Sequence, residues 1–566
     1  MLGKPMNRLL SAINGLAHPP KGDASEWLSS AEEGVAFLKQ NAIAPVVVLY
    51  ASVGSVLIHS VLAPLKRLDP PNQQELGHDF IMPDDTWMFE HVSGGGDPDR
   101  VYLAPPMDRL SQTLREGEKL FFRRSFAASQ HSPLELSQKL VHALDLHFVQ
   151  ERNAYCRLNE DGDVENVITV IEIPGSFYDR GTVVTILAKD FAEYMCLSGM
   201  GAVIFFDFTR TERGNFSGWD ETNPITASAR DLFYHGGVMQ GRGSYVNGRM
   251  VVRPSITYED ILASRVEERS GKRRQYATFK AIDLKTGDPI EVSCSPEALS
   301  NYFQKDSPLP LEMSPAFFRA EVLHRYKADP DKYELRDRSI YCRGTWDLRT
   351  FDINDQGQVH TYLVYLRDRP YKEQLYWQAF NEWPKGPLSK RAITTDFKGE
   401  YYTEYDSLNS IKQKIRGLDD RKPDWWAVRG DDLAKAVHYP ATTSSAEWAN
   451  EILALDHLII EGLRERALRS LAGSLGCVPQ SDWKSLRLLQ ECLAAAGIDP
   501  EDARVACNAL RDLREMRNVA KGHAASSKRK QLEKDAITHY GTFRAHFTAL
   551  SQRCDSCLEL ILLNLA

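Results

Sequence analysis

The spacing of hydrophobic residues predicts strands in the middle of this chain and helices towards its two ends. Between residues 150 and 310 the apolar positions form short β-branched runs bounded by Gly and Pro, which is typical of strands. These runs cover 167–171, 182–187 and 202–208. Amphipathic spacing predicts helices over 24–41 and 133–147. A β-hairpin is predicted over 345–366, with its turn at Gly357.

The apolar run 46–65 is long enough to suggest a membrane span. His59, Pro64 and the small residues at 52–55 argue against this interpretation. We therefore expect a buried strand first, then a turn of small residues and a buried helix, with no membrane association.

Beyond residue 440 the strand signals end and the pattern predicts four helices. Ser444 and the glutamate three residues later have the spacing of a capping box, so the first helix begins there. The second helix follows Ser481, and the third has Asp499 as its cap and Pro500 in its first helical position. The fourth runs from about 527 to the end of the sequence, with one face apolar throughout. Short connections between these helices favour an antiparallel bundle.

The expected fold class is multi-domain α+β, with β-rich N-terminal and central regions before a C-terminal antiparallel four-helix bundle. The predicted segments are an α/β region, a β-rich domain, an aromatic-rich α+β segment and the helical domain, at 1–130, 131–310, 311–440 and 441–566. Trp377, Trp383, Trp425 and Trp426 belong to the aromatic-rich segment. Such rings form a stacking platform for bases or, more commonly, a packed core.

Composition narrows the class of protein. Apolar residues make up 43% and charged residues 26% of the chain, as in ordinary globular proteins. A net charge of -8 argues against a protein that coats nucleic acid non-specifically. The nine scattered cysteines suit a reducing compartment, and no clear signal peptide is present, so we expect a cytoplasmic protein.

The most informative residues lie at the end of the third predicted helix. Arg517 follows Leu510 by seven positions, so it occupies an apolar phase of that helix. A guanidinium there either reaches out to solvent or faces a cleft with an anionic occupant. His523 lies six positions further on, beyond Gly522, where the helix can end and turn the ring back towards Arg517. The simpler interpretation is a helix-terminal Arg and His that favour the negative end of the helix dipole.

Arg517, Asn518 and His523 in this helical context resemble the motif of HEPN (higher eukaryotes and prokaryotes nucleotide-binding) domains, over residues 441–566. Ribonuclease members of that family carry an Arg, a polar residue, a short spacer and a His. The resemblance implies metal-independent RNA cleavage that leaves a 2′,3′-cyclic phosphate and a 5′-hydroxyl. It assigns proton transfer to His523, phosphate binding to Arg517, and orientation of one of these groups to Asn518. It also implies a homodimer through this domain.

Other residues are weaker candidates. Lys521, Lys528 and Arg529 are expected to contact the RNA backbone. Cys554 and Cys557 form a CxxC pair, but they lie on the apolar face and lack two further ligands, so we expect core packing. No metal and no cofactor are expected.

The sequence thus predicts a toxin-like endoribonuclease, of the kind found in antiviral or abortive-infection defence, whose residues 1–440 sense a trigger or restrain the nuclease. The expected partners are RNA, a second copy of the chain, and a phage-derived trigger or an antitoxin. The alternative is a non-catalytic scaffold whose HEPN-like bundle only dimerises or binds a nucleotide.

Overall fold

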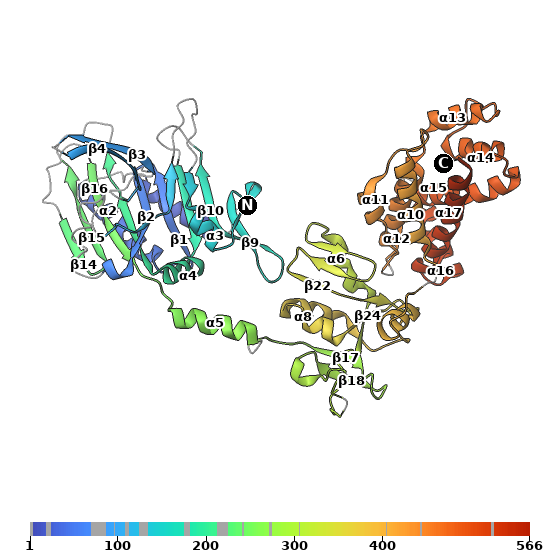
Figure 1. Ribbon diagram of the computed structural model, residues 1–566, viewed down its shortest axis with the longest axis horizontal. Coiled ribbons are helices and arrows are strands. Elements are labelled where there is room, and N and C mark those ends of the chain that lie inside the picture. Colours follow the sequence, from blue (N-terminus) through green and yellow to red (C-terminus); the bar gives the residue numbers. More distant parts are fainter. Residues whose placement is uncertain are drawn as a thin grey trace. The chain divides into compact units, whose positions relative to one another are not determined.

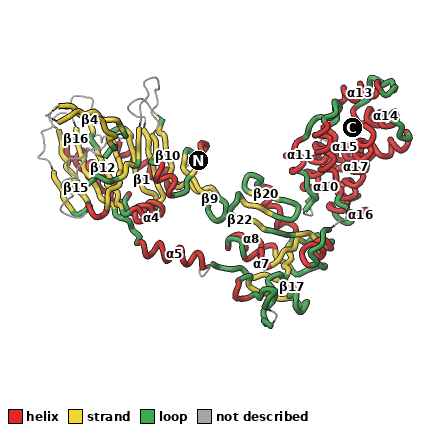
Figure 2. The backbone as a smooth tube through the Cα atoms, viewed as in Figure 1, coloured by secondary structure: helices red, strands yellow, loops and turns green. Residues whose placement is uncertain are grey.

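The computed structural model describes most of the chain, and the residues divide into two compact units (Figure 1). The described residues are 4–17, 24–68, 86–94, 97–107, 113–123, 134–174, 181–211, 225–239, 243–270, 274–304, 306–402, 405–441, 444–521 and 526–565. The first unit comprises Met1–Asn159 and Asp163–Arg274, and the second comprises Glu160–Gly162 and Gln275–Ala566. Strands dominate the first unit, whereas the second passes from mixed structure to helices (Figure 2). The α+β class with β-rich N-terminal and central regions is therefore confirmed.

The first unit is built on an antiparallel sheet, to which twelve strands contribute among the described residues. Its order is β14-β15-β16-β12-β2-β1-β11-β10-β9-β8, with β13 on β16 and β5 on β2. The strands are β1 (Val46–Val53), β2 (Val56–Pro64), β5 (Glu118–Lys119), β8 (His147–Val149), β9 (Ala154–Leu158), β10 (Val164–Ile173), β11 (Gly181–Leu187), β12 (Met200–Asp207), β13 (Arg210–Thr211), β14 (Ile225–Ala229), β15 (Leu232–Met239) and β16 (Gly243–Val252). Two separate antiparallel pairs are β3 (Met88–Gly94) with β4 (Asp97–Ala104), and β6 (Phe121–Arg123) with β7 (Leu134–Leu136).

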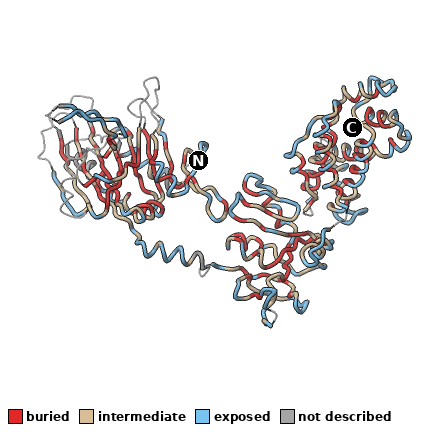
Figure 3. Tube along the Cα trace, viewed as in Figure 1, coloured by how far each residue is buried: buried red, intermediate tan, exposed pale blue. Residues whose placement is uncertain are grey.

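Both faces of this sheet carry apolar cores, because successive strand residues point to opposite sides. Val48 of β1 packs with α1 (Lys4–Ala17) and α2 (Ala24–Asn41). Its neighbours Val47 and Leu49 pack with α3 (Gln138–Ala143) and α4 (Ala188–Ser198). The central strands are accordingly buried, whereas α5 (Tyr258–Ser270) is largely exposed (Figure 3).

Three predicted strand runs are confirmed within β10, β11 and β12, and the helix over 24–41 is confirmed as α2. The buried helix expected after residue 55 is wrong, because that segment is strand β2. It pairs with β1 across a tight turn at Gly54, whose φ is 54°. The helix expected over 133–147 is reduced to α3 between two strands. No helix in the described ranges has an apolar stretch that could cross a bilayer.

The second unit begins with two small antiparallel sheets. One has the order β18-β17-β19-β24-β23 with β25 on β19, and the other is β20-β21-β22. The strands are β17 (Thr278–Ile282), β18 (Pro289–Ser293), β19 (Pro315–Phe318), β20 (Tyr333–Leu335), β21 (Ile340–Cys342), β22 (Trp346–Leu348), β23 (Asp352–Ile353), β24 (Val359–Tyr362) and β25 (Asn381–Glu382). The helices among them are α6 (His324–Ala328), α7 (Leu363–Arg367), α8 (Tyr371–Phe380) and α9 (Lys390–Ala392), which continues into a π-helical turn, Ile393–Phe397.

The aromatic residues of this region mostly form cores. Trp377 is 1% exposed within the mixed part, and Trp425 and Trp426 are buried in the helical part. Only Trp383 of the four predicted rings is substantially exposed, and Lys280 lies over it. The core interpretation is therefore confirmed for three of the four.

The hairpin predicted over 345–366 is partly wrong. Gly357, with a φ of 74°, does turn the chain between β23 and β24. However, β22 pairs with β21 instead, and residues from 363 onward form α7. The strands of the hairpin are therefore shorter than the apolar pattern suggested.

The helical part of the second unit extends from residue 407 to the end of the described chain. Its helices are α10 (Ser407–Arg421), α11 (Gly430–Ala436), α12 (Ser445–Ile459), α13 (Glu465–Ser474), α14 (Ser485–Ala495), α15 (Pro500–Lys521), α16 (Ser526–Tyr540) and α17 (Phe543–Leu565). One core joins them, and it includes Leu408, Ile411 and Ile415 of α10. The helical core thus takes in residues before the predicted boundary at 441.

Two helices differ from the sequence prediction. The region after residue 441 contains α13, which was not expected. The long fourth helix is also wrong, because Gly541 has a φ of 78° and ends α16. Thr542 then starts α17, since its Oγ1 accepts a hydrogen bond from the Ala545 amide at 3.0 Å.

Candidate active site

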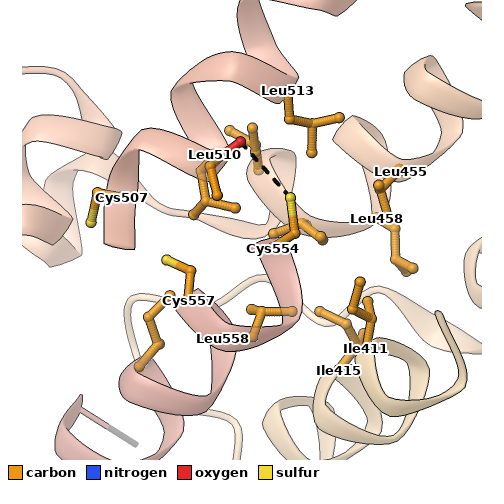
Figure 4. Packing of buried hydrophobic residues seen from close by; sticks show 14 of the residues in the cluster. Ile411, Ile415, Leu455, Leu458, Cys507, Leu510, Leu513, Cys554, Cys557 and Leu558 are labelled. Atoms are coloured by element: carbon orange, nitrogen blue, oxygen red, sulfur yellow. Dashed lines mark hydrogen bonds between the residues drawn. The ribbon is translucent and has the colours of Figure 1, made fainter. Parts of the chain in front are cut away.

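Helix α15 carries two of the three predicted catalytic residues, Arg517 and Asn518, near its C-terminal end. Its start is fixed as the sequence predicted, because Asp499 Oδ1 accepts hydrogen bonds from the amides of Glu501 (2.9 Å) and Asp502 (3.3 Å). Its apolar face then packs Cys507, Leu510 and Leu513 into the core, each fully buried (Figure 4). This packing fixes the rotation of α15 and therefore the side on which Arg517 lies.

Arg517 lies at the edge of that buried face. Its side chain is 32% exposed, so it is neither fully buried nor free in solvent. One guanidinium nitrogen, Nη1, donates to Asn518 Oδ1 at 3.0 Å. The other contacts are long: Nε is 3.9 Å from Asp456 Oδ2, and Nη2 is 3.8 Å from Glu461 Oε1. These two separations exceed hydrogen-bond length, so the fork keeps donors for a further anion.

Asp456 of α12 is the buried counter-charge beside this arginine. The residue is fully buried, and its Oδ1 lies 2.8 Å from Nε of Arg514. Burial raises the pKa of the Asp456 carboxyl, while the charges of Arg514 and Arg517 act to lower it. A carboxylate in this position attracts both guanidinium groups towards α12 and limits where Arg517 can reach.

A histidine that the sequence did not single out lies in the same cluster. His457 Nε2 is 3.5 Å from Glu461 Oε1, the same oxygen that approaches Arg517. The signal available in the sequence was the four-residue spacing of His457 and Glu461. Their link to Arg517 depends on the packing of α12 against α15, which the spacing alone does not reveal.

The remaining predicted residues are placed only in part. Lys521 is the last residue of α15, and His523 lies outside the described residues. Lys528 and Arg529 belong to the first turn of α16, where Lys528 is exposed. Arg529 Nε donates to Glu533 Oε1 at 3.0 Å, one helical turn away.

The CxxC pair belongs to the core, as predicted. Cys554 and Cys557 of α17 are both fully buried and lie near Cys507 and Leu510 of α15 (Figure 4). Burial raises the pKa of the Cys554 thiol. Within the described ranges, no group of three or more His, Cys, Asp or Glu side chains is arranged to hold a metal ion.

Comparisons with known proteins returned no relative. No protein-family model, no curated protein and no solved structure matches the chain. Functional inference therefore depends on the residues and their geometry.

Proposed function

We propose that this protein is a metal-independent endoribonuclease of the HEPN type, with Arg517, Asn518 and His523 as its catalytic residues. The observation that carries the proposal is the position of Arg517 at the end of α15. Its guanidinium is partly exposed and is attracted by Asp456. Some of its N–H groups do not donate a hydrogen bond to any neighbouring carboxylate. A guanidinium in this state suits a phosphodiester, because its planar fork matches two phosphate oxygens.

The proposed reaction is an internal transfer at phosphorus. His523 takes the proton from a ribose 2′-hydroxyl or returns one to the leaving 5′-oxygen, since imidazole exchanges protons near neutral pH. Arg517 stabilises the charge that develops on the phosphate oxygens. Asn518 orients Arg517 through the hydrogen bond between their side chains. The products are a 2′,3′-cyclic phosphate and a 5′-hydroxyl, and Lys521, Lys528 and Arg529 contact the RNA backbone.

The helical arrangement supports a HEPN-like bundle. Residues of α12, α14, α15 and α17 share one core, and α15 packs against the other three. In the proposed dimer, two copies of this region face each other so that both motifs contribute to one RNA-binding groove.

The proposed biological role is that of a toxin-like effector in antiviral or abortive-infection defence. The first unit has its own cores and contains none of the three proposed catalytic residues. A unit of that kind suits the detection of a trigger or restraint of the nuclease, with a phage-derived molecule or an antitoxin as the partner.

The direct test is RNA cleavage by the purified full chain in the presence of EDTA. Arg517→Ala is expected to lose at least about 100-fold in rate, as when one stabilising group of a transition state is removed. Arg504→Ala is the matched control, because Arg504 lies on the same helix but pairs with exposed Glu501 at its start. Equal activity in Arg517→Ala and Arg504→Ala would exclude the proposed role of Arg517.

A second function is favoured by the carboxylates around Arg517. Asp456 and Glu461 explain a partly buried arginine without any substrate, as expected for a non-catalytic dimerisation or nucleotide-binding scaffold. Overproduction in cells separates the two functions. A nuclease slows growth and Arg517→Ala relieves the effect, whereas a scaffold gives the same growth with either chain.

A further inference from the structure

A cavity of about 890 Å³ lies within the second unit, apart from Arg517 and its neighbours. Strands β20 and β23 and the turn at α9 supply part of its lining. The rest of the lining comes from α10 and the residues just before it, from α11 and the segment after it, and from the first turn of α17. The volume lies in the range of sites that enclose small molecules, about 300–1,000 Å³.

The arginines from the mixed α+β part are already paired. Arg338 Nη2 lies 2.6 Å from Asp396, and Arg391 Nη2 lies 2.7 Å from Asp352. The pKa of the Asp352 carboxyl is held below its ordinary value by Arg391, against the opposing effect of burial. This side of the cavity therefore has little unbalanced charge.

The cations from the helical part lack such partners. Within the described ranges, no ion pair joins Lys412 of α10, Lys435 of α11 or Arg544 of α17 to a carboxylate. Arg544 lies over the Tyr439 ring at 5.0 Å, and its Nη1 donates to the Pro440 carbonyl at 3.4 Å.

Burial makes the charges of Lys412 and Arg544 costly without an anion, whereas Lys435 is exposed. Burial lowers the pKa of both Lys412 and Arg544. The carboxylates that oppose this only in part are Asp337, Asp406 and Glu451 for Lys412, and Asp352 and Asp337 for Arg544. Asp406 is also engaged elsewhere, since it accepts hydrogen bonds from the Asn409 amide and the Tyr439 hydroxyl at 2.9 Å each. Over the whole lining, seven Lys and Arg side chains face five carboxylates.

We propose that this cavity binds a small molecule carrying two or more phosphate groups, with Lys412 and Arg544 as its principal contacts and Lys435 at the rim. A multiply charged anion supplies the counter-charge that the protein omits on this side. Phosphate oxygens also accept several hydrogen bonds from ammonium and guanidinium groups at once. The limited volume of the cavity and the mixed charge of its lining favour a compact ligand over an extended RNA strand.

The test is a calorimetric titration of the full chain with tripolyphosphate, ATP and adenosine as separate probes. Binding of tripolyphosphate and ATP alike identifies the phosphate chain as the recognised group, whereas binding of ATP alone identifies a nucleotide. Either result supports the proposal when Lys412→Gln and Arg544→Gln each weaken binding by about tenfold, the loss expected for one charged contact.

Two control variants separate an effect at the cavity from a general effect of removing a lysine. Lys39→Gln removes an exposed lysine at the end of α2 in the first unit, and its affinity is expected to equal that of the parent chain. Lys435→Gln changes an exposed rim residue and preserves folding, so a weaker effect of a few fold is expected there. The proposal is overturned if neither phosphate probe binds, if both bind Lys412→Gln and Arg544→Gln as they bind the parent, or if only an RNA oligonucleotide binds in a way that these variants weaken.

Discussion

Acid should destabilise the helical part of the second unit through His546. This residue of α17 is 6% exposed, and its Nδ1 accepts a hydrogen bond from the Trp448 indole at 3.1 Å. The edges of Trp448 and Tyr540 enclose the ring, with centroids 5.3 and 5.0 Å away. Burial, and to a lesser extent Arg553, lowers the pKa of His546 to about 4. A proton on Nδ1 would also eliminate the bond from Trp448.

The direction and size of the effect follow from this pKa. The unfolded chain binds a proton on this ring near pH 6.5, whereas the folded chain does so near 4. His546 therefore contributes its full stabilisation above about pH 6.5 and loses it as the pH falls towards 4. Between pH 7 and pH 5 the expected loss in the free energy of unfolding is about 1 to 2 kcal/mol.

Equilibrium urea unfolding of the full chain at pH 7 and pH 5 measures this loss. His546→Gln removes the titrating ring. Between pH 7 and pH 5, the free energy of unfolding of this variant is therefore expected to fall by about 1 to 2 kcal/mol less than that of the parent. Other titrating groups contribute equally to the pH-dependent change of the parent and of the variant, so their contribution cancels when the two changes are subtracted. His539→Gln is the matched control, because His539 is an exposed histidine of α16. Identical pH dependence in the parent and His546→Gln would refute the reasoning.

Three further substitutions test the packing of the second unit. Ser444→Ala removes the N-cap acceptor of α12 and should cost about 1 kcal/mol in urea unfolding, whereas Ser444→Asp should retain most of it. Gly462→Ala would place a Cβ 2.4 Å from the buried Trp426 ring, so a loss of about 1–3 kcal/mol and a lower melting temperature are expected. Lys327→Met leaves buried Glu451 without its cation and should cost about 3 kcal/mol at pH 7. Burial already raises the pKa of Glu451, so acid should restore part of that loss; an unchanged deficit at pH 5 would contradict this explanation.

Local signals in the sequence predicted the helix starts that depend only on neighbouring residues. The capping residues Ser444 and Asp499 start α12 and α15 as expected, because an N-cap acts on its own first turn. Strand β2 differs from the predicted helix because it is buried on both faces of the sheet, so its sequence does not alternate between apolar and polar residues. The break at Gly541 was missed because the apolar stripe continues through it in phase.

In the candidate site, too, the sequence predicted what depends on local spacing and missed what depends on the packing of distant segments. The spacing of Arg517 from Leu510 predicted an apolar phase of the helix, from which the guanidinium reaches solvent or faces a cleft. In the structure the Arg517 side chain lies beside the buried face and is 32% exposed. Asp456 and Glu461 were not anticipated, because they precede Arg517 by more than fifty residues. Only the packing of α12 on α15 brings Asp456, and Glu461 in the turn that follows α12, close to Arg517.

The most direct test of the proposed nuclease compares RNA cleavage by the parent chain and by His523→Ala, with EDTA present throughout. We expect cleavage by the parent with 2′,3′-cyclic phosphate ends, and a loss of about 100-fold or more in His523→Ala, the usual contribution of a general acid or base. His457→Ala, which alters the histidine that shares Glu461 with Arg517, is expected to retain most of the activity. Cleavage by His523→Ala at the rate of the parent would contradict the account.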